Sequence, residues 1–184
     1  MAASSGLGSP LHDLGLGPLA WDAAQWTRHP WTLWTAAWVH TSAGSLSGNL
    51  LALAALTVLG AAFGAGRPAS LALAVAWPLT TLALLLWPEV ASYAGLGGPN
   101  HAAAAVLAVH VARRTTLKPL AALLFGGIGL KLALERAWVQ PVAFDPSWGF
   151  NVVYAAHLVG TVAGIACAIA LYWFFEPQSH LHQS

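Results

Sequence analysis

The sequence predicts an all-α, polytopic transmembrane helix bundle with about five spans. Of its 184 residues, 58% are hydrophobic and only 7% are charged, whereas about a quarter of the residues in a soluble domain are charged. Long apolar stretches recur between turn residues and charges, each near the roughly 17 to 25 residues that a helix needs to cross the hydrocarbon layer. No alternating strand pattern recurs, and only helices or closed barrels satisfy every backbone group in lipid.

The composition also excludes several classes of protein. Seven basic and six acidic side chains cannot cover the surface of a soluble globule, which rules out an ordinary soluble enzyme and a disordered tail. The same scarcity excludes a nucleic-acid binder that relies on a basic stripe. The single cysteine, Cys167, excludes a disulfide scaffold and a cysteine-based zinc site. We therefore expect the lipid bilayer, and no nucleic acid, as a partner.

The five predicted spans follow one another with short connections. The first stretch, 45–63, ends at a Gly-Ala-Gly-Arg-Pro turn, and the second, 69–87, ends at Pro88. The third, 99–114, is short and ends at two arginines. The fourth, 119–137, begins at a proline, and the fifth, 151–175, is the longest.

The chain divides into a membrane domain and two small flanking segments. Residues 1–30 contain no span and are expected to be a loose or interfacial segment. Residues 31–176 form the predicted membrane domain, and 177–184 a short tail. Five tryptophans gather near the start of the chain and suit the headgroup layer, which tryptophan prefers: they are Trp21, Trp26, Trp31, Trp34 and Trp38.

The basic residues predict the orientation of the bundle. Arg67 lies between the first two spans, and Arg113, Arg114 and Lys118 lie between the third and the fourth. The positive-inside rule places these two loops in the cytoplasm, so the N-terminus faces outward. His110, near the arginines, is expected to be solvated at this edge.

With this orientation, polar residues gather at the outward ends of three spans and predict a cavity open to that face. They are His40 with Asn49, Asn100 with His101, and Asn151 with His157.

Five segments between Trp31 and Ala168 resemble, in order and spacing, those of the rhomboid family of intramembrane serine proteases. Within that family, the sequence is most similar to the bacterial branch called rhombosortase. The segments are Trp31-Thr-Leu-Trp-Thr-Ala-Ala-Trp-Val-His40, Asn49 nine residues after His40, Tyr93-Ala-Gly95-Leu96-Gly97-Gly98 with His101, Gly129-Leu-Lys131-Leu-Ala-Leu-Glu135, and His157-Leu-Val-Gly160-Thr-Val-Ala-Gly164.

The resemblance implies a serine–histidine dyad in which serine attacks the peptide carbonyl and histidine takes its proton. His157 matches the base and Asn49 an oxyanion donor, with His40, Gly95, Gly98 and His101 supporting the site. The resemblance also implies that the protein is a multi-pass protein of the bacterial inner membrane, that its site faces the periplasm and that it needs no cofactor. The implied substrates are membrane-anchored proteins with a C-terminal Gly-Gly tail and a transmembrane helix.

Two positions depart from the family pattern at the chemistry itself. Gly97 stands where the family has its nucleophilic serine, beside backbone donors that would steady an oxyanion. Ser45 stands where a second histidine would complete the oxyanion hole. A catalytically impaired protein is therefore expected. Ser45, and less so Ser92, are the other hydroxyls considered near the site, but neither stands at the helix start where the backbone donors point, so neither is expected to replace the nucleophile. The family's first helix is also expected to be missing.

Other interpretations of the same residues stay open. The chain is alternatively a pseudoprotease that binds transmembrane helices without cutting them. A metal or haem site at His40, His101 and His157 is disfavoured because no carboxylate or cysteine is expected beside them, and a small transporter because no inverted repeat is found. Lys131 and Glu135 predict a mainly structural ion pair within one helix.

Gly160 and Gly164 form a small-xxx-small pair. Such pairs allow two helices to approach closely, so these glycines are predicted to serve helix packing.

Overall fold

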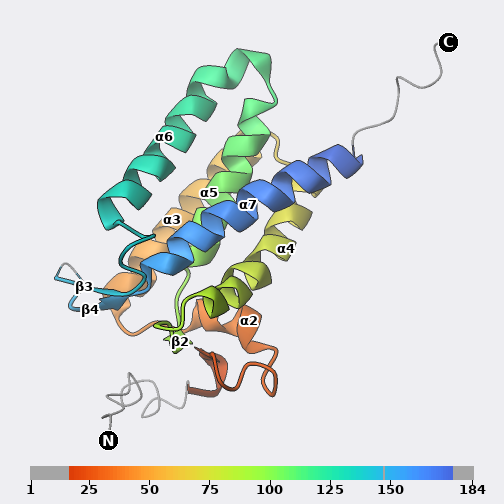
Figure 1. Ribbon diagram of the computed structural model, residues 1–184. Coiled ribbons are helices and arrows are strands. Elements are labelled where there is room, and N and C mark those ends of the chain that lie inside the picture. Colours follow the sequence, from red (N-terminus) through yellow and green to blue (C-terminus); the bar gives the residue numbers. More distant parts are fainter. Residues whose placement is uncertain (1–16, 147, 176–184) are drawn as a thin grey trace, which may run out of the picture.

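The computed structural model describes residues 17–146 and 148–175, and within these ranges five long helices form one bundle (Figure 1). They are α3 (Ala43–Ala62), α4 (Arg67–Ala83), α5 (Gly97–Ala112), α6 (Lys118–Glu135) and α7 (Tyr154–Phe175). Short elements lie between them and before them. These are η1 (Gly17–Leu19), β1 (Trp21–Asp22), α2 (Thr32–Thr35), η2 (Ala36–Trp38), η3 (Leu84–Leu86), β2 (Ser92–Tyr93), η4 (Thr115–Leu117), β3 (Ala143–Asp145) and β4 (Phe150–Val152). The first sixteen residues and the 177–184 tail, which the domain division separates from the membrane domain, lie outside the described residues.

The structure is mostly helical and indicates a membrane protein, as the composition predicts. By length and composition, three segments of the described chain are long and apolar enough to cross a bilayer: α3, α4 with its 3-10 extension Arg67–Leu86, and α7. Helix α5 has 16 residues, about 24 Å at 1.5 Å per residue, which is short of the roughly 30 Å of hydrocarbon. Helix α6 has two lysines and a glutamate within its 18 residues. Five spans therefore remain a prediction.

Local signals explain where several helices begin and end. Ser42 caps α3, where its hydroxyl accepts a hydrogen bond from the Ser45 amide at 3.1 Å, a typical N-cap interaction. Gly64, just beyond that helix, has φ +67°, a conformation that glycine adopts without a Cβ penalty. Helix α7 begins at Tyr154, three residues later than the predicted span, because Asn151 instead pairs with Phe144 in the β3–β4 hairpin.

Helix α7 packs most extensively against α5 and α4, and α5 contacts all four other long helices. The two glycines of α7, Gly160 and Gly164, face the backbone of α5. A Cβ added at Gly164 would lie 2.5 Å from the carbonyl oxygen of Ala102, and one at Gly160 would overlap the carbonyl of Gly98. The close approach that the small-xxx-small spacing predicts is therefore present between α5 and α7.

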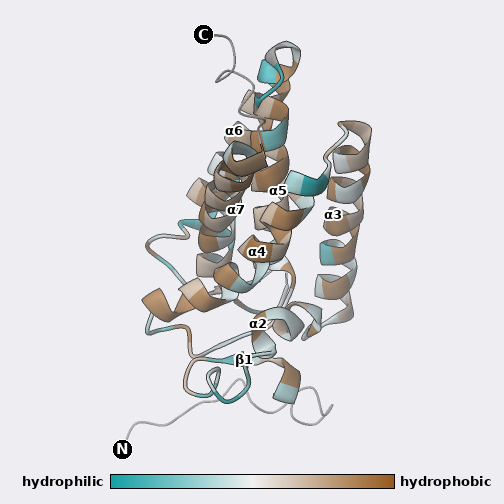
Figure 2. Ribbon diagram, turned by 90° about the vertical axis from the view of Figure 1, so that its right-hand side faces the viewer, coloured by the Kyte–Doolittle hydropathy of each residue, from teal (hydrophilic) through white to brown (hydrophobic). Residues whose placement is uncertain are grey.

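The outer helices expose apolar surface. Helix α3 has no buried residue, and Leu51 on α3 and Leu134 on α6 are 72% and 75% exposed. Figure 2 shows hydrophobic residues along both helices, with α3 at one edge of the bundle. Apolar faces of this extent suit contact with lipid, because their exposure to water would carry a large free-energy cost.

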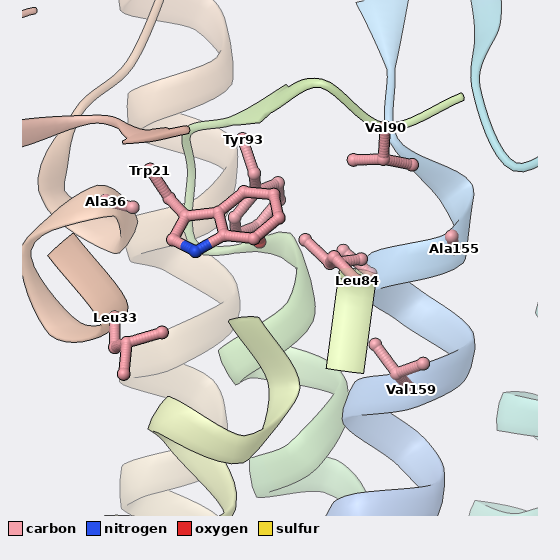
Figure 3. Packing of buried hydrophobic residues seen from close by; sticks show 9 residues of the cluster. Trp21, Leu33, Ala36, Leu84, Val90, Tyr93, Ala155 and Val159 are labelled. Atoms are coloured by element: carbon pink, nitrogen blue, oxygen red, sulfur yellow. The ribbon is translucent and has the colours of Figure 1, made fainter. Parts of the chain in front are cut away.

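One tryptophan differs from the interfacial prediction made for all five. Trp21 is fully buried, whereas Trp31, Trp34 and Trp38 are 47–57% exposed. The Trp21 strand pairs with Tyr93, so its ring enters a cluster between the N-terminal segment and α7. Figure 3 shows this ring beside Tyr93, with Leu33, Leu84, Val90 and Val159 around them. The cluster anchors the segment before α3 to the end of the bundle where the polar residues gather.

The prediction that His110 is solvated is wrong. This histidine is 8% exposed, and its Nε2 lies 3.0 Å from the Phe63 carbonyl oxygen. Its Nδ1 lies 2.5 Å from the Tyr172 hydroxyl of α7. The imidazole therefore joins α5, α7 and the end of α3, which satisfies polar groups that the packing takes out of water.

Candidate functional site

The site is built where α5 and α7 begin next to each other. Gly97 is the first residue of α5, and His157 lies in the first turn of α7. A Cβ added at Gly97 would lie 2.6 Å from Nε2 of His157 and 3.1 Å from its Cδ2. The imidazole edge therefore lies directly against the glycine backbone. The two positions that the resemblance pairs as nucleophile and base are neighbours in space, sixty residues apart in sequence.

Glu135, the last residue of α6, holds the other edge of the same imidazole. Its Oε2 is 2.8 Å from Nδ1 of His157, and its Oε1 is 2.5 Å from Nζ of Lys131. The side chains of Glu135 and His157 are each 11% exposed, whereas Lys131 is 54% exposed. A carboxylate on Nδ1 favours the tautomer in which Nε2 carries the lone pair. The free edge of His157 then faces Gly97 as a base.

His101 covers one face of His157. The two rings stack with centroids 4.2 Å apart and planes inclined by 13°. His101 lies one helical turn after Gly97, and its Nδ1 is 2.7 Å from the Gly97 carbonyl oxygen. Tyr154 meets the His157 ring edge-on at 5.8 Å. The orientation of the His157 imidazole is therefore restricted from several sides.

The loop before α5 is fixed by the buried hydroxyl of Tyr93. This hydroxyl donates to the Gly95 carbonyl at 2.7 Å and accepts from the Gly98 amide at 3.0 Å. Gly95 has φ +118°, which excludes most side chains, and a Cβ at Gly98 would lie 2.7 Å from Thr80 Cγ2. Burial raises the pKa of Tyr93 well above its usual value, the larger effect, although the Gly98 amide opposes it. Gly95 and Gly98 thus allow the backbone conformation that places Gly97 at the start of α5.

The polar residues of α3 form a second group beside this one. The Asn49 amide nitrogen lies 3.4 Å from His40 Nε2. Asn100, on α5, donates to the backbone and side-chain oxygens of Asn49 at 3.0 and 3.2 Å. Burial lowers the pKa of His40, partly opposed by the Trp38 carbonyl. Asn49 is thus brought to α5 through Asn100, the neighbour of His101.

Two of the polar residues singled out in the sequence take part in local structure, Ser45 in a helix cap and Asn151 in a hairpin. Among the described residues, the hydroxyl of Ser45 makes no hydrogen bond to Gly97 or His157, and the Ser45 amide is engaged in capping α3. Asn151 is exposed in β4, opposite Phe144. The remaining polar residues predicted to converge do lie at the shared end of α3, α5 and α7.

The main feature that sequence reasoning missed is the contact of Glu135 with His157. The predicted Lys131–Glu135 ion pair forms, and the second carboxylate oxygen lies on His157, a contact that the prediction did not include. The expectation that no carboxylate accompanies the histidines is wrong, because ligand atoms of His101, Glu135 and His157 all lie within 4.8 Å of one another. His40 is not part of this cluster. The available signal was the position of Glu135 at the outward end of its span, the same end as His157 in the alternating topology.

No protein-family model, curated protein or solved structure matches this chain.

Proposed function

We propose that this chain is a rhombosortase-type member of the rhomboid family that has lost its nucleophile. On this proposal it lies in the bacterial inner membrane as a multi-pass protein, with the site facing the periplasm. It engages membrane-anchored proteins that have a C-terminal Gly-Gly tail and a transmembrane helix. The observation on which the proposal depends is the contact of His157 Nε2 with Gly97 at the start of α5.

Three features of the structure support a site made for acyl transfer. The base has a free Nε2 edge, and a buried carboxylate holds its Nδ1, the arrangement that orients a catalytic imidazole. The helix that begins at position 97 offers its positive end to an oxyanion. A hydroxyl at position 97 would therefore meet both a base and a field that stabilises developing negative charge.

The same contact supports an impaired rather than an active enzyme. Glycine has no group to form an acyl-enzyme, and the loss of a serine nucleophile lowers kcat by about 10⁶-fold in a well-studied serine protease. A Cβ at position 97 must gain about 0.8 Å to reach an ordinary 3.4 Å contact with His157 Nε2. The imidazole has thus settled into space that a serine side chain would occupy.

The test is cleavage of a membrane-anchored Gly-Gly-tail reporter in bacteria. We compare the native chain with Gly97→Ser and with Gly97→Ser/His157→Ala. The expected result is cleavage by Gly97→Ser alone. Cleavage by the native chain that His157→Ala abolishes would place the nucleophile elsewhere and overturn the impairment, with Ser45→Ala as the next variant.

A binding measurement tests the non-catalytic alternative, in which the chain retains its partner without cutting it. A photo-reactive residue in the Gly-Gly tail of the reporter should cross-link to the native chain. A reporter whose tail has two alanines in place of the glycines is the matched control. If Gly97→Ser does not cut and neither tail cross-links, the assignment of this substrate class is wrong.

A further inference from the structure

We propose that His101, Glu135 and His157 together bind a divalent transition-metal ion of the zinc type. The proposal rests on the side chains of three helices and is independent of the function proposed above. One ligand atom from each residue lies within 4.8 Å of the other two. Two imidazoles and one carboxylate form a ligand set that zinc uses where a fourth position stays open to water or substrate.

The three residues come from separate helices that the fold fixes against one another. His101 lies on α5, Glu135 ends α6, and His157 lies on α7. Packing against the Gly98 and Ala102 backbone holds α7 to α5, so two of the three ligands have a rigid frame. A site on packed helices loses less conformational entropy when the ion binds than a site on loops.

Two of the three ligands, His101 and Glu135, also have a neighbour that orients a metal ligand. The Nδ1 of His101 faces the Gly97 carbonyl at 2.7 Å, which leaves Nε2 as the coordinating atom. Lys131 binds Oε1 of Glu135 and leaves Oε2 beside His157. Histidine ligands of metals usually donate their other N–H to a carbonyl or carboxylate in this way.

Binding requires a defined local rearrangement. Glu135 Oε2 and His157 Nδ1 share a proton at 2.8 Å, and neighbouring ligands of tetrahedral zinc are about 3.3 Å apart, given bonds of about 2.0–2.1 Å. The ion then binds Nδ1 of His157, the proton of the neutral imidazole moves to Nε2, and the Glu135–His157 pair opens slightly. Because the imidazole planes are inclined by only 13°, one ring must turn before both can coordinate. Metal binding is therefore expected to break the His101–His157 stack.

Gly97, which has no side chain, lies beside one of the proposed metal ligands, His157. Gly97 lies against Nε2 of His157, on the other edge of the ring from the Nδ1 that faces Glu135, so a larger residue at position 97 would compete with His157 for space. A branched side chain at this position, larger than serine, is expected to displace the His157 ring and disturb the ligand set. Gly97→Val therefore tests the site from a residue that is not itself a ligand.

The experiment measures binding of Zn²⁺ and Co²⁺ by the full chain. The protein is purified in detergent with a histidine-free tag, treated with a chelator and titrated with Zn²⁺ by calorimetry. Co²⁺ is added separately, and its visible absorption reports nitrogen and oxygen coordination. Because His180 and His182 in the tail can also bind metal, all samples are made in a His180→Gln/His182→Gln background, with His29→Gln as the matched control.

The expected result is one Zn²⁺ per chain with a dissociation constant near or below about 1 μM. His101→Gln, Glu135→Gln and His157→Gln should each weaken binding at least about 100-fold, while His29→Gln leaves it unchanged. Circular dichroism and gel filtration of the metal-free variants show whether each keeps the native fold, and Glu135→Gln preserves the shape of the side chain. Absence of stoichiometric binding to the parent chain, or equal binding by folded forms of all three variants, would refute the site.

Discussion

Replacement of Tyr93 by phenylalanine tests how the loop before α5 is held. The variant keeps the ring in its cluster with Trp21 and Leu84 and removes only the hydroxyl. That hydroxyl bonds the Gly95 carbonyl at 2.7 Å and the Gly98 amide at 3.0 Å. Because Gly98 lies in the first turn of α5, its amide has no partner within the helix.

The expected loss of stability follows from the Gly95 carbonyl and the Gly98 amide, which both lose their hydrogen-bond partner. Tyr93 is 5% exposed, and each unpaired buried donor or acceptor costs about 1–3 kcal/mol. Tyr93→Phe should therefore lower the free energy of unfolding by about 2–6 kcal/mol. Titration with sodium dodecyl sulfate from a mild detergent, followed by tryptophan fluorescence, measures this difference.

Tyr154→Phe is the matched control. Its hydroxyl donates to the Asp145 carboxylate at 3.0 Å from a half-buried position, so water can replace the bond and the loss should stay below about 1 kcal/mol. A loss for Tyr93→Phe below about 0.5 kcal/mol, or equal to that of the control, would show that this hydroxyl does not hold the loop.

The same titration checks four further expectations. Burial raises the pKa of Tyr93, so the unfolded chain releases this proton first and stability should fall as the pH rises above about 10, less steeply in Tyr93→Phe. Gly160→Ala should cost about 1–3 kcal/mol, because its Cβ overlaps the backbone of Gly98; an unaffected midpoint would contradict the close α5–α7 contact. Gly126→Ala, where a Cβ on α6 meets nothing within 4 Å, should instead stabilise by about 0.5–1 kcal/mol. His110→Leu leaves the Phe63 carbonyl and the Tyr172 hydroxyl without this partner and should cost about 2–4 kcal/mol; a change under about 0.5 kcal/mol would mean that water already serves these groups.

Much of the helical framework was predictable because it depends on local properties. An apolar stretch of bilayer length must satisfy its backbone internally, and this condition alone predicts a helix. The observed α3 and α6 begin and end within two residues of the predicted spans 45–63 and 119–137. The start of α7 was misplaced because the β3–β4 hairpin forms between residues that show no strand pattern of their own.

The sequence by itself determined the apolar helices, the glycine at position 97 and the set of polar residues available at one end of them. Only the tertiary structure decided which of these meet: His157 contacts Gly97 and Glu135 across three helices, while Ser45 is engaged as part of a helix cap. It also decided that Trp21 and His110 are buried. The physical reason is that hydrophobicity and length act within a segment, whereas contacts between side chains depend on how each helix is rotated and packed against its neighbours.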